Sequence, residues 1–162
     1  MKIISGLLLI VGLVCAQATA ANATPYVTLG AGWFDFNTNT KESAVFSAEW
    51  KGNSFYNNFV PIIGANVNTD GGLYGYGGVA YDWQFAPNWF LTPGLAAGLY
   101  SQGNSKDLGG AFEFHEELEL SYKFDSGYRI GAEITHTSNA SIYDSNPGVN
   151  TLMATFSLPL PY

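Results

Sequence analysis

A histidine and a serine that could do chemistry lie two residues apart at the end of a strand-like run, His136-Thr137-Ser138. On a β-strand the two side chains would share one face, about 7 Å apart, because each residue advances a strand by about 3.3 Å. A nearby histidine base is what makes a serine hydroxyl nucleophilic. Asn139 follows and could offer its side-chain amide to a developing oxyanion. Such a pair is also common at solvated strand ends, so the surrounding elements decide its meaning.

The N-terminus has the pattern of a secretory signal peptide. Met1-Lys2 is a short basic start, an apolar core follows, and Ala18-Thr19-Ala20 is a small-residue cleavage pattern. The apolar core is shorter than the roughly 20 residues that a membrane-spanning helix needs. We therefore predict that residues 1–20 are removed and that residues 21–162 form one domain. This removal takes away the single cysteine, Cys15, so no internal disulfide is expected.

The rest of the chain shows the period of two that is typical of strands, with turn residues between the runs. Eight strands are predicted, at about Tyr26–Phe36, Ala44–Trp50, Phe59–Val67, Leu73–Phe85, Trp89–Tyr100, Ala111–Phe124, Tyr128–Ser138 and Asn150–Leu160. Tight turns at Ala86-Pro87-Asn88 and Asp125-Ser126-Gly127 alternate with longer polar loops. Pro61, Pro93 and Pro159 fall within strand runs, where a missing N–H favours bulges or strand ends.

The run Ala111–Phe124 separates apolar from polar side chains most clearly. Alternate positions carry Phe112, Phe114, Leu118, Leu120, Tyr122 and Phe124, against Glu113, His115, Glu117, Glu119 and Lys123. A soluble β-sandwich could show the same alternation. The C-terminus favours a membrane barrel, because an alternating apolar row ends at the aromatic Tyr162 and resembles the assembly signal of bacterial outer-membrane proteins. We therefore predict an all-β, eight-stranded antiparallel transmembrane β-barrel in the outer membrane, with short turns on one side and long loops on the other.

Composition excludes several classes of function. With 13 acidic and 6 basic residues the chain is a poor candidate for nucleic acid, whose phosphates require clustered lysine and arginine. No nucleotide-binding pattern is present, and no histidine or cysteine spacing matches a zinc site, so no cofactor or metal is expected. His115 lies among glutamates on the predicted inner face, where a buried polar network is the simpler interpretation.

Strand parity predicts where the histidine and serine point. In the run Tyr128–Ser138 the apolar face continues through Ile134 to His136 and Ser138, while Glu133 takes the opposite face. If the apolar face meets lipid, the pair lies on the outer wall of the barrel. Polar groups that face hydrocarbon require partners, which favours a functional explanation.

At this point the sequence resembles the outer-membrane lipid A 3-O-deacylases, the PagL family. The resemblance rests on Gly109–Phe114, Leu118–Phe124, Gly131, His136-Thr137-Ser138-Asn139-Ala140 and Asn146-Pro147-Gly148. It implies an eight-stranded barrel with its active site on the lipid-facing wall. It also implies a serine esterase that removes the 3-linked hydroxyacyl chain from lipid A, so lipopolysaccharide would be the partner.

The resemblance also assigns roles to residues. Ser138 would be the nucleophile, His136 the base and Asn139 an oxyanion donor, while Asn146 matches a family asparagine in the loop. The family has a glutamate fourteen residues after the histidine, and this chain has Asn150 there. An asparagine can accept the imidazole N–H and orient the ring, but it cannot offset the imidazolium charge.

Glu116 is a second candidate for the third member of the triad. If Phe124 pairs with Tyr128 across the tight turn, counting back along both strands sets Glu116 opposite His136. Directly opposed Cβ atoms lie about 5 Å apart, which allows a hydrogen bond. Glu116 could therefore orient His136 in place of Asn150 or together with it, whereas a shift of one residue in register would separate them.

Two other functions remain open from the sequence. One is a non-catalytic small barrel with a structural or adhesion role, and the other is a family member that has lost activity through the change at Asn150. The preferred acyl length and the oligomeric state do not follow from the sequence.

Overall fold

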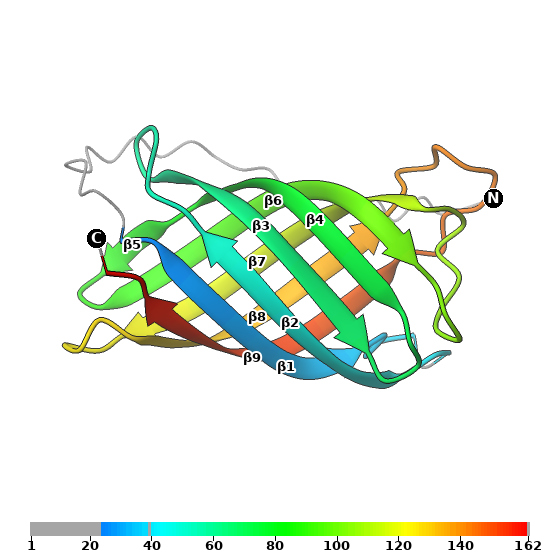
Figure 1. The fold of residues 1–162 in the computed structure, drawn as a ribbon, viewed down its shortest axis with the longest axis horizontal. Coiled ribbons are helices and arrows are strands. Elements are labelled where there is room, and N and C mark those ends of the chain that lie inside the picture. Colours follow the sequence, from blue (N-terminus) through cyan, green and yellow to red (C-terminus); the bar gives the residue numbers. More distant parts are fainter. Residues whose placement is uncertain (1–23, 39, 162) are drawn as a thin grey trace.

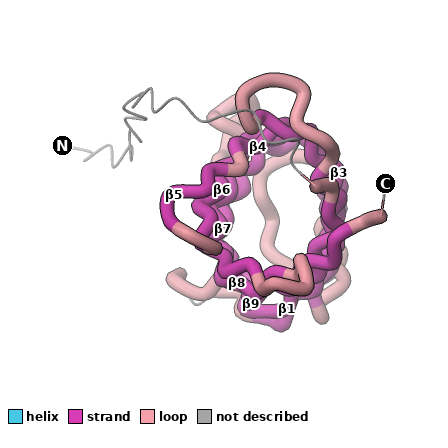
Figure 2. Tube along the Cα trace, turned by 90° about the vertical axis from the view of Figure 1, so that its left-hand side faces the viewer, coloured by secondary structure: helices cyan, strands magenta, loops and turns pink. Residues whose placement is uncertain are grey.

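The computed structural model describes residues 24–38 and 40–161, which form a closed antiparallel β-barrel (Figures 1 and 2). The strands are β1 (Tyr26–Phe34), β2 (Ser43–Lys51), β3 (Phe59–Asn68), β4 (Leu73–Tyr81), β5 (Trp83–Ala86), β6 (Trp89–Ser101), β7 (Phe112–Lys123), β8 (Arg129–Ser138) and β9 (Val149–Pro159). The expected signal peptide, residues 1–20, lies outside the described residues, as does Tyr162. Within the described ranges, no helix has the length and apolar character needed to cross a membrane.

The sheet closes because the first and last strands of the chain pair with each other and β4 pairs past β5 with β6. β1 pairs with β2 and β9, and β4 pairs with β3 and β6, so the ladder runs round the ring. β4 and β5 are one run interrupted at Asp82, and both pair with β6. Counted in this way the barrel has the eight strands predicted from the sequence, and Figure 2 shows the ring from the end that carries the short turns.

The prolines coincide with the ends of ladders. Pro159 ends β9, as expected. Pro61 and Pro93 lie inside β3 and β6, which continue past them, so the expectation that these strands would bulge or stop is wrong for the strands themselves. Each of these two prolines lies just beyond the last pair of one ladder, Lys51↔Ile62 for Pro61 and Ala80↔Gly94 for Pro93. The missing N–H therefore falls where one neighbouring strand has ended.

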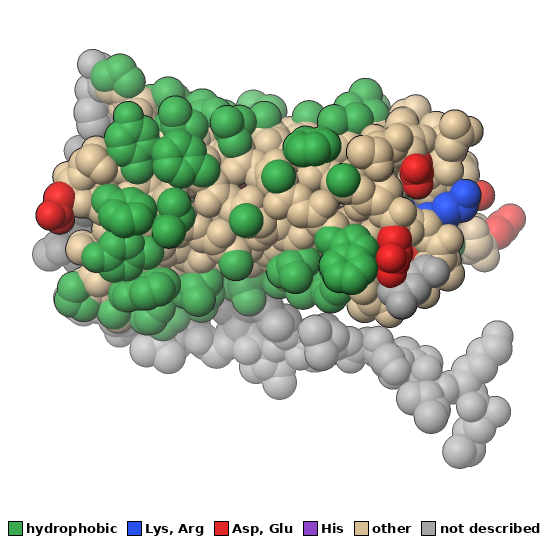
Figure 3. Space-filling model, turned by 90° about the horizontal axis from the view of Figure 1, so that it is seen from below, with side chains coloured by type: hydrophobic (Ala, Val, Ile, Leu, Met, Phe, Trp, Pro, Cys, Tyr) green, Lys and Arg blue, Asp and Glu red, His purple; other side chains and the backbone are tan. Residues whose placement is uncertain are grey.

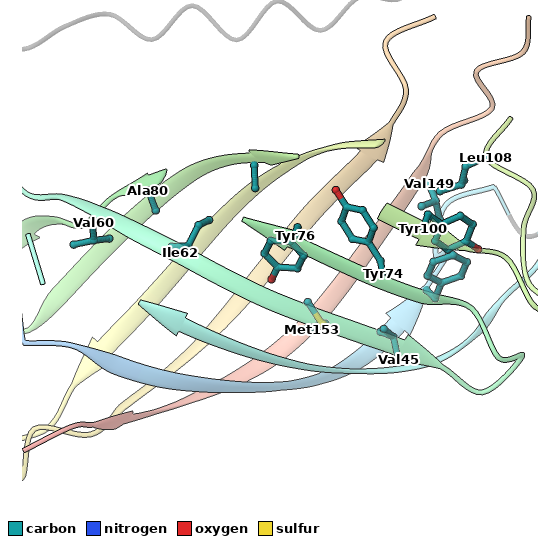
Figure 4. Packing of buried hydrophobic residues seen from close by; sticks show 12 residues of the cluster. Val45, Val60, Ile62, Tyr74, Tyr76, Ala80, Tyr100, Leu108, Val149 and Met153 are labelled. Atoms are coloured by element: carbon teal, nitrogen blue, oxygen red, sulfur yellow. The ribbon is translucent and has the colours of Figure 1, made fainter. Parts of the chain in front are cut away.

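The barrel interior is filled with side chains. The inward residues of β7 are buried polar groups, among them Glu113, His115 and Glu119, as strand parity predicted. Tyr74 and Tyr76 project into the lumen (Figure 4), where the ring of Tyr76 stacks on His115 at 4.3 Å. The interior is therefore a packed core rather than a pore.

Two buried cationic side chains form ion pairs with acidic side chains in the lumen. Lys51 pairs with Glu119. Arg129 makes a bidentate pair with Asp82, at 2.8 and 2.9 Å, and its guanidinium lies 3.7 Å from the centre of the Phe90 ring. Planar bidentate pairs of this kind are the strongest ionic contacts available to a buried carboxylate.

The outer wall is apolar and carries large aromatic side chains near both ends. The exposed aromatic residues include Trp33, Phe46, Trp50, Phe59, Trp83, Phe85, Trp89, Phe112, Phe114, Phe124, Tyr128 and Phe156. Figure 3 shows hydrophobic side chains concentrated toward one end of the barrel, with acidic and basic side chains together at the other end and a separate acidic side chain at the tip of the apolar end. An apolar band flanked by aromatic rings is the surface of a transmembrane barrel.

The two ends of the barrel differ in the length of their connections (Figure 1). The turns after β5 and β7 are short, and the predicted turn at residues 125–127 is confirmed, because Phe124 N–H donates to Tyr128 O at 2.9 Å. The loops after β1, β6 and β8 meet at the other end, which we call the long-loop end. β8 runs toward the long-loop end, and His136-Thr137-Ser138 are its last three residues before the loop 139–148.

Candidate active site

Three neighbouring strands bring the candidate residues together near the long-loop end. His136 on β8 lies directly opposite Glu116 on β7 and, on its other side, directly opposite Asn150 on β9. Ser138 is the last residue of β8 and lies opposite Phe114. The register that places Glu116 across from His136 is the one predicted from the tight turn. Both candidates for the third triad member therefore flank the histidine.

The histidine and serine lie on the outer wall. His136 and Ser138 are partly exposed. The residues of the opposite parity are buried in the lumen, namely Glu133, Thr135 and Thr137. The parity prediction for β8 is confirmed. A substrate for this pair must therefore approach from the side of the barrel rather than through its interior.

The imidazole of His136 is held by Asn150. Its Nδ1 lies 2.7 Å from Asn150 Oδ1. A carbonyl oxygen can only accept a hydrogen bond, so Nδ1 carries the ring proton and donates the hydrogen bond to Asn150. In the neutral ring Nε2 is then left with a free lone pair, which is the tautomer that a general base requires.

Gly148 lets the ring and the serine converge. It adopts a φ of +62°, and a Cβ placed on it would lie 3.0 Å from His136 Cε1, 3.5 Å from His136 Nε2 and 3.6 Å from Ser138 Cβ. The basic nitrogen and the serine side chain therefore border the same small volume next to this glycine. Any side chain at position 148 would enter that volume and would also strain the left-handed backbone.

A pocket of about 320 Å³ opens on the wall beside this pair. Its lining residues are Leu95, Ala96, Phe114, His115, Glu116, His136, Ser138 and Ala140. Most of the side chains that border it from β6 and β7 are apolar, and the candidate nucleophile and base lie at its edge. The arrangement suits an apolar chain whose reactive group lies at the level of the strand ends.

Asn139 shapes the loop rather than facing the pocket. Its buried amide donates to Leu108 O at 2.7 Å and to Ser145 O at 2.9 Å, and its Oδ1 accepts from the Ser141 N–H. Both amide protons are thus used, so this side chain is not free to stabilise an oxyanion as the sequence suggested. Asn146 supports the same turn, because its Oδ1 accepts the Asn139 backbone N–H at 3.0 Å.

The backbone after Asn139 adopts a strained conformation. Ala140 and Ser141 both have positive φ, 51° and 64°. Such conformations cost on the order of 1–3 kcal/mol each and persist where the surroundings impose them. The hydrogen bonds of the Asn139 backbone and side chain supply that constraint, and the result is that Ala140 lines the pocket together with Ser138.

Glu116 lies on the pocket wall, but the hydrogen bond of the imidazole goes to Asn150. The Glu116 side chain is exposed on the outer face and borders the same volume as His136 and Ser138. Asn150 thus accepts the hydrogen bond of the imidazole, while Glu116 is an acidic residue that lines the same pocket.

Sequence reasoning missed Gly148 and Ala140. Gly148 is visible in the sequence only as part of an Asn-Pro-Gly turn, which has a structural explanation of its own. Ala140 carries no functional group, and its place in the pocket follows from a left-handed backbone that no local pattern predicted. His136, Ser138 and Asn139 were identified in the sequence by their type and position, and Glu116 by the predicted register. Asn146 and Asn150 were identified through the family resemblance.

Fold and site together define a small transmembrane β-barrel with a serine–histidine–asparagine arrangement on its lipid-facing wall. Comparison with known proteins agrees with this class. The family model described as lipid A 3-O-deacylase (PagL) matches residues 25–159, and the chain belongs to this family. It is accordingly an ester hydrolase of the outer membrane.

Individual relatives agree with this assignment. The lipid A deacylase PagL of Bordetella bronchiseptica is 25% identical over 151 residues, which cover 88% of this chain and 85% of the relative. The crystal structure of the outer membrane enzyme PagL superposes with a TM-score of 0.67 at 16% identity, over 83% of this chain and 99% of that one. The solution NMR structure of the de novo designed protein TMB2.3 superposes with a TM-score of 0.59 at 13% identity, over 90% of this chain and 100% of that one. These two structures support the fold alone.

Proposed function

We propose that this chain hydrolyses the 3-linked hydroxyacyl ester of lipid A, with Ser138 as nucleophile and His136 as base. The observation that carries the proposal is the pocket on the lipid-facing wall, which places Ser138 beside a histidine whose proton is fixed on Nδ1 by Asn150. A lipid A molecule in the membrane would present its acyl chains to this wall. The ester at the root of such a chain would lie near the strand ends, at the level of Ser138.

The proposed reaction has two steps, acylation of Ser138 and hydrolysis of the acyl-enzyme. His136 Nε2 takes the proton of Ser138 as Oγ attacks the ester carbonyl carbon, and the resulting imidazolium returns the proton to the departing sugar oxygen. Water then attacks the acyl-enzyme with His136 again as base, which releases the hydroxy fatty acid and restores Ser138. Hydrogen bonds between nucleophile and base commonly tighten only when substrate is bound.

Two groups would stabilise the charges that form. Ala140 borders the pocket together with Ser138, and its backbone N–H is our candidate for the oxyanion donor, with Asn139 and Asn146 holding its loop. Glu116 faces the imidazolium from the opposite strand and would supply the negative charge that Asn150 lacks. An asparagine in the third position is therefore compatible with activity in this chain.

Mass spectrometry of lipid A from cells expressing the protein tests this function. Wild-type protein is expected to remove one hydroxyacyl chain, and Ser138→Ala to leave lipid A intact. Ser126→Ala, in the exposed turn after β7, is a matched control that should behave as wild type. Unchanged lipid A in cells that contain folded wild-type barrel would favour the non-catalytic barrel instead. Deacylation by Ser138→Ala would remove the serine from the mechanism.

A further inference from the structure

Asn150 makes a second hydrogen bond through the nitrogen of its side-chain amide. While Oδ1 accepts from His136, Nδ2 donates to Asn37 Oδ1 at 3.0 Å. Asn37 lies in the loop that joins β1 to β2, 113 positions away from Asn150 in sequence. The contact therefore links an outer loop to the residue that orients the base.

An asparagine in this position needs such a contact, whereas a carboxylate would not. The two oxygens of a carboxylate are equivalent acceptors, but an amide has one acceptor end and one donor end. If the Asn150 amide turned over, its N–H groups would face His136 Nδ1, which would then have to accept. The proton would move to Nε2, and the ring could no longer act as base toward Ser138.

The loop that carries Asn37 is built around a buried carboxylate. The Asp35 backbone N–H donates to Asn150 O at 2.9 Å, so the loop begins hydrogen-bonded to β9. The Asp35 carboxylate, 0% exposed, accepts hydrogen bonds from the backbone N–H groups of Thr40 and Lys41 and from Lys106 Nζ at 2.7 Å. Hydrogen bonds to β9, to Thr40 and Lys41 and to Lys106 therefore hold the loop on either side of Asn37.

Building on the proposed function, we infer that Asn37 is a positioning residue that holds the Asn150 amide with its oxygen toward His136. It acts through Asn150 on the tautomer of the base and does not touch the reacting atoms. The charged group that faces His136 from β7 is Glu116, while β9 contributes the neutral Asn150. The tautomer therefore depends on how the amide is oriented.

The tautomer can be measured without turnover. The chain has 2 histidines, His115 and His136, so nitrogen-15 spectra of the histidine-labelled protein in detergent micelles contain two rings. Wild-type His136 is expected as the Nδ1–H form, and Asn37→Ala should give a mixture of the two forms. Asn37→Asp can only accept from Asn150 and should restore the Nδ1–H form. A pure Nδ1–H form in Asn37→Ala would overturn the inference.

Kinetics give the second readout. Asn37→Ala should lower kcat about tenfold, the scale of one net hydrogen bond, and leave KM unchanged. In an Asn150→Glu background the same substitution should cost less than about twofold, because a carboxylate needs no fixed orientation. Equal losses in both backgrounds, or a loss confined to KM, would show that Asn37 acts in another way, for example on the substrate. Asn53→Ala, an exposed asparagine at the opposite end, is the matched control.

The proposed function and this inference fail separately. Deacylation by Ser138→Ala would rule out Ser138 as the nucleophile, but it would not affect the test of Asn37 by the His136 tautomer. An inactive Ser138→Ala variant together with an unaltered tautomer in Asn37→Ala would keep the mechanism and remove Asn37 from it.

Discussion

At the scale of single residues, the proposed mechanism divides the roles of one carboxylate between two side chains. Asn150 accepts the Nδ1–H of His136 at 2.7 Å, and Glu116 lies opposite His136 on the neighbouring strand β7. Orientation and charge compensation can therefore be removed one at a time. The separation gives two predictions.

Removing the acceptor should disable the base. Asn150→Ala leaves His136 without its Nδ1 partner, so the ring loses both its tautomer and its orientation, and kcat should fall about 10²-fold. Asn150→Glu, which restores the family's residue, should keep at least wild-type activity. The measurement is the rate of ester hydrolysis in detergent micelles, and full activity of Asn150→Ala would rule out this role.

Removing the charge should cost less. Glu116→Gln keeps the size of the side chain but leaves the imidazolium without a nearby anion, and kcat should fall about five- to tenfold, which corresponds to roughly 1 kcal/mol for an exposed pair. The loss should shrink when Asn150→Glu supplies a second carboxylate. Glu42→Gln, on the exposed loop after β1, is the control. Wild-type turnover by Glu116→Gln would show that this carboxylate has no part in catalysis.

At the scale of elements, two loops complete what the strands begin. The loop 139–148 packs Gly148 against the histidine ring, and the loop 35–42 is organised by Asp35. Strand pairing sets Asn150 opposite His136, and the loops add Gly148 next to the histidine ring and Asn37 on the Asn150 amide. Each loop therefore carries a prediction of its own.

Gly148→Ala should reduce activity more than stability. The added Cβ would lie 3.0 Å from His136 Cε1, tight enough to displace the ring. Gly71→Ala is a close control, because its φ of +83° is also left-handed while nothing lies within 4 Å of its added Cβ. Both variants should lose about 1–2 kcal/mol of stability from backbone strain, but kcat should fall in Gly148→Ala alone. Equal activities of the two variants would contradict the packing role.

The Asp35 loop should stay anchored in mildly acidic solution. Burial raises the pKa of Asp35, but hydrogen bonds from Lys106, from two threonine hydroxyls and from the Lys41 N–H outweigh it and hold the pKa well below its ordinary value. A lowered pKa stabilises the fold above the unfolded-state value of 3.8, and this contribution is lost only as the pH falls through the lower folded-state value.

Amide protection factors of residues 40 and 41, corrected for intrinsic exchange, should therefore be the same at pH 7 and pH 4. Asp35→Asn should lose this protection already at pH 7, whereas Asp125→Asn in the exposed turn should not. A loss of protection in wild type between pH 7 and pH 5 would contradict the anchoring role of the carboxylate.

The same elements show what a sequence can and cannot predict here. The alternation in β7 and the three-residue turn after it are local, and together they set Glu116 opposite His136 correctly. The partner on the other side of His136 follows a long loop, and loop length does not fix register. Asn150 was recognised through the family's spacing, while the contact between Asn37 and Asn150 joins distant loops and left no local signal.

At the scale of the whole molecule, stability depends on matching buried charges in the lumen. Arg129 is the only partner that makes a bidentate contact with Asp82 in the part of the chain that the structure describes, and the pair lies between the Tyr26 and Phe90 rings. Removing one member of such a pair leaves a buried charge uncompensated.

Arg129→Met should therefore lower the free energy of unfolding by about 3–5 kcal/mol. The measurement is a urea titration in phospholipid vesicles, followed by tryptophan fluorescence. Lys123→Met, a partly exposed cation near the end of β7, should change it by less than about 0.5 kcal/mol. If the two variants unfold at the same urea concentration, the lumenal pair does not contribute as described.

The pairing of β1 with β9 gives the barrel a seam, and the site is built across it. Asn150 belongs to β9, and Asn37 belongs to the segment that leaves β1. A chain still threading into the membrane, with these two strands apart, would have Asn150 beside His136 on the β8–β9 pair but would lack Asn37 to hold the Asn150 amide. Ester hydrolysis should therefore reach its full rate only when the last strand has joined the first, so that the rate of hydrolysis reports completed assembly.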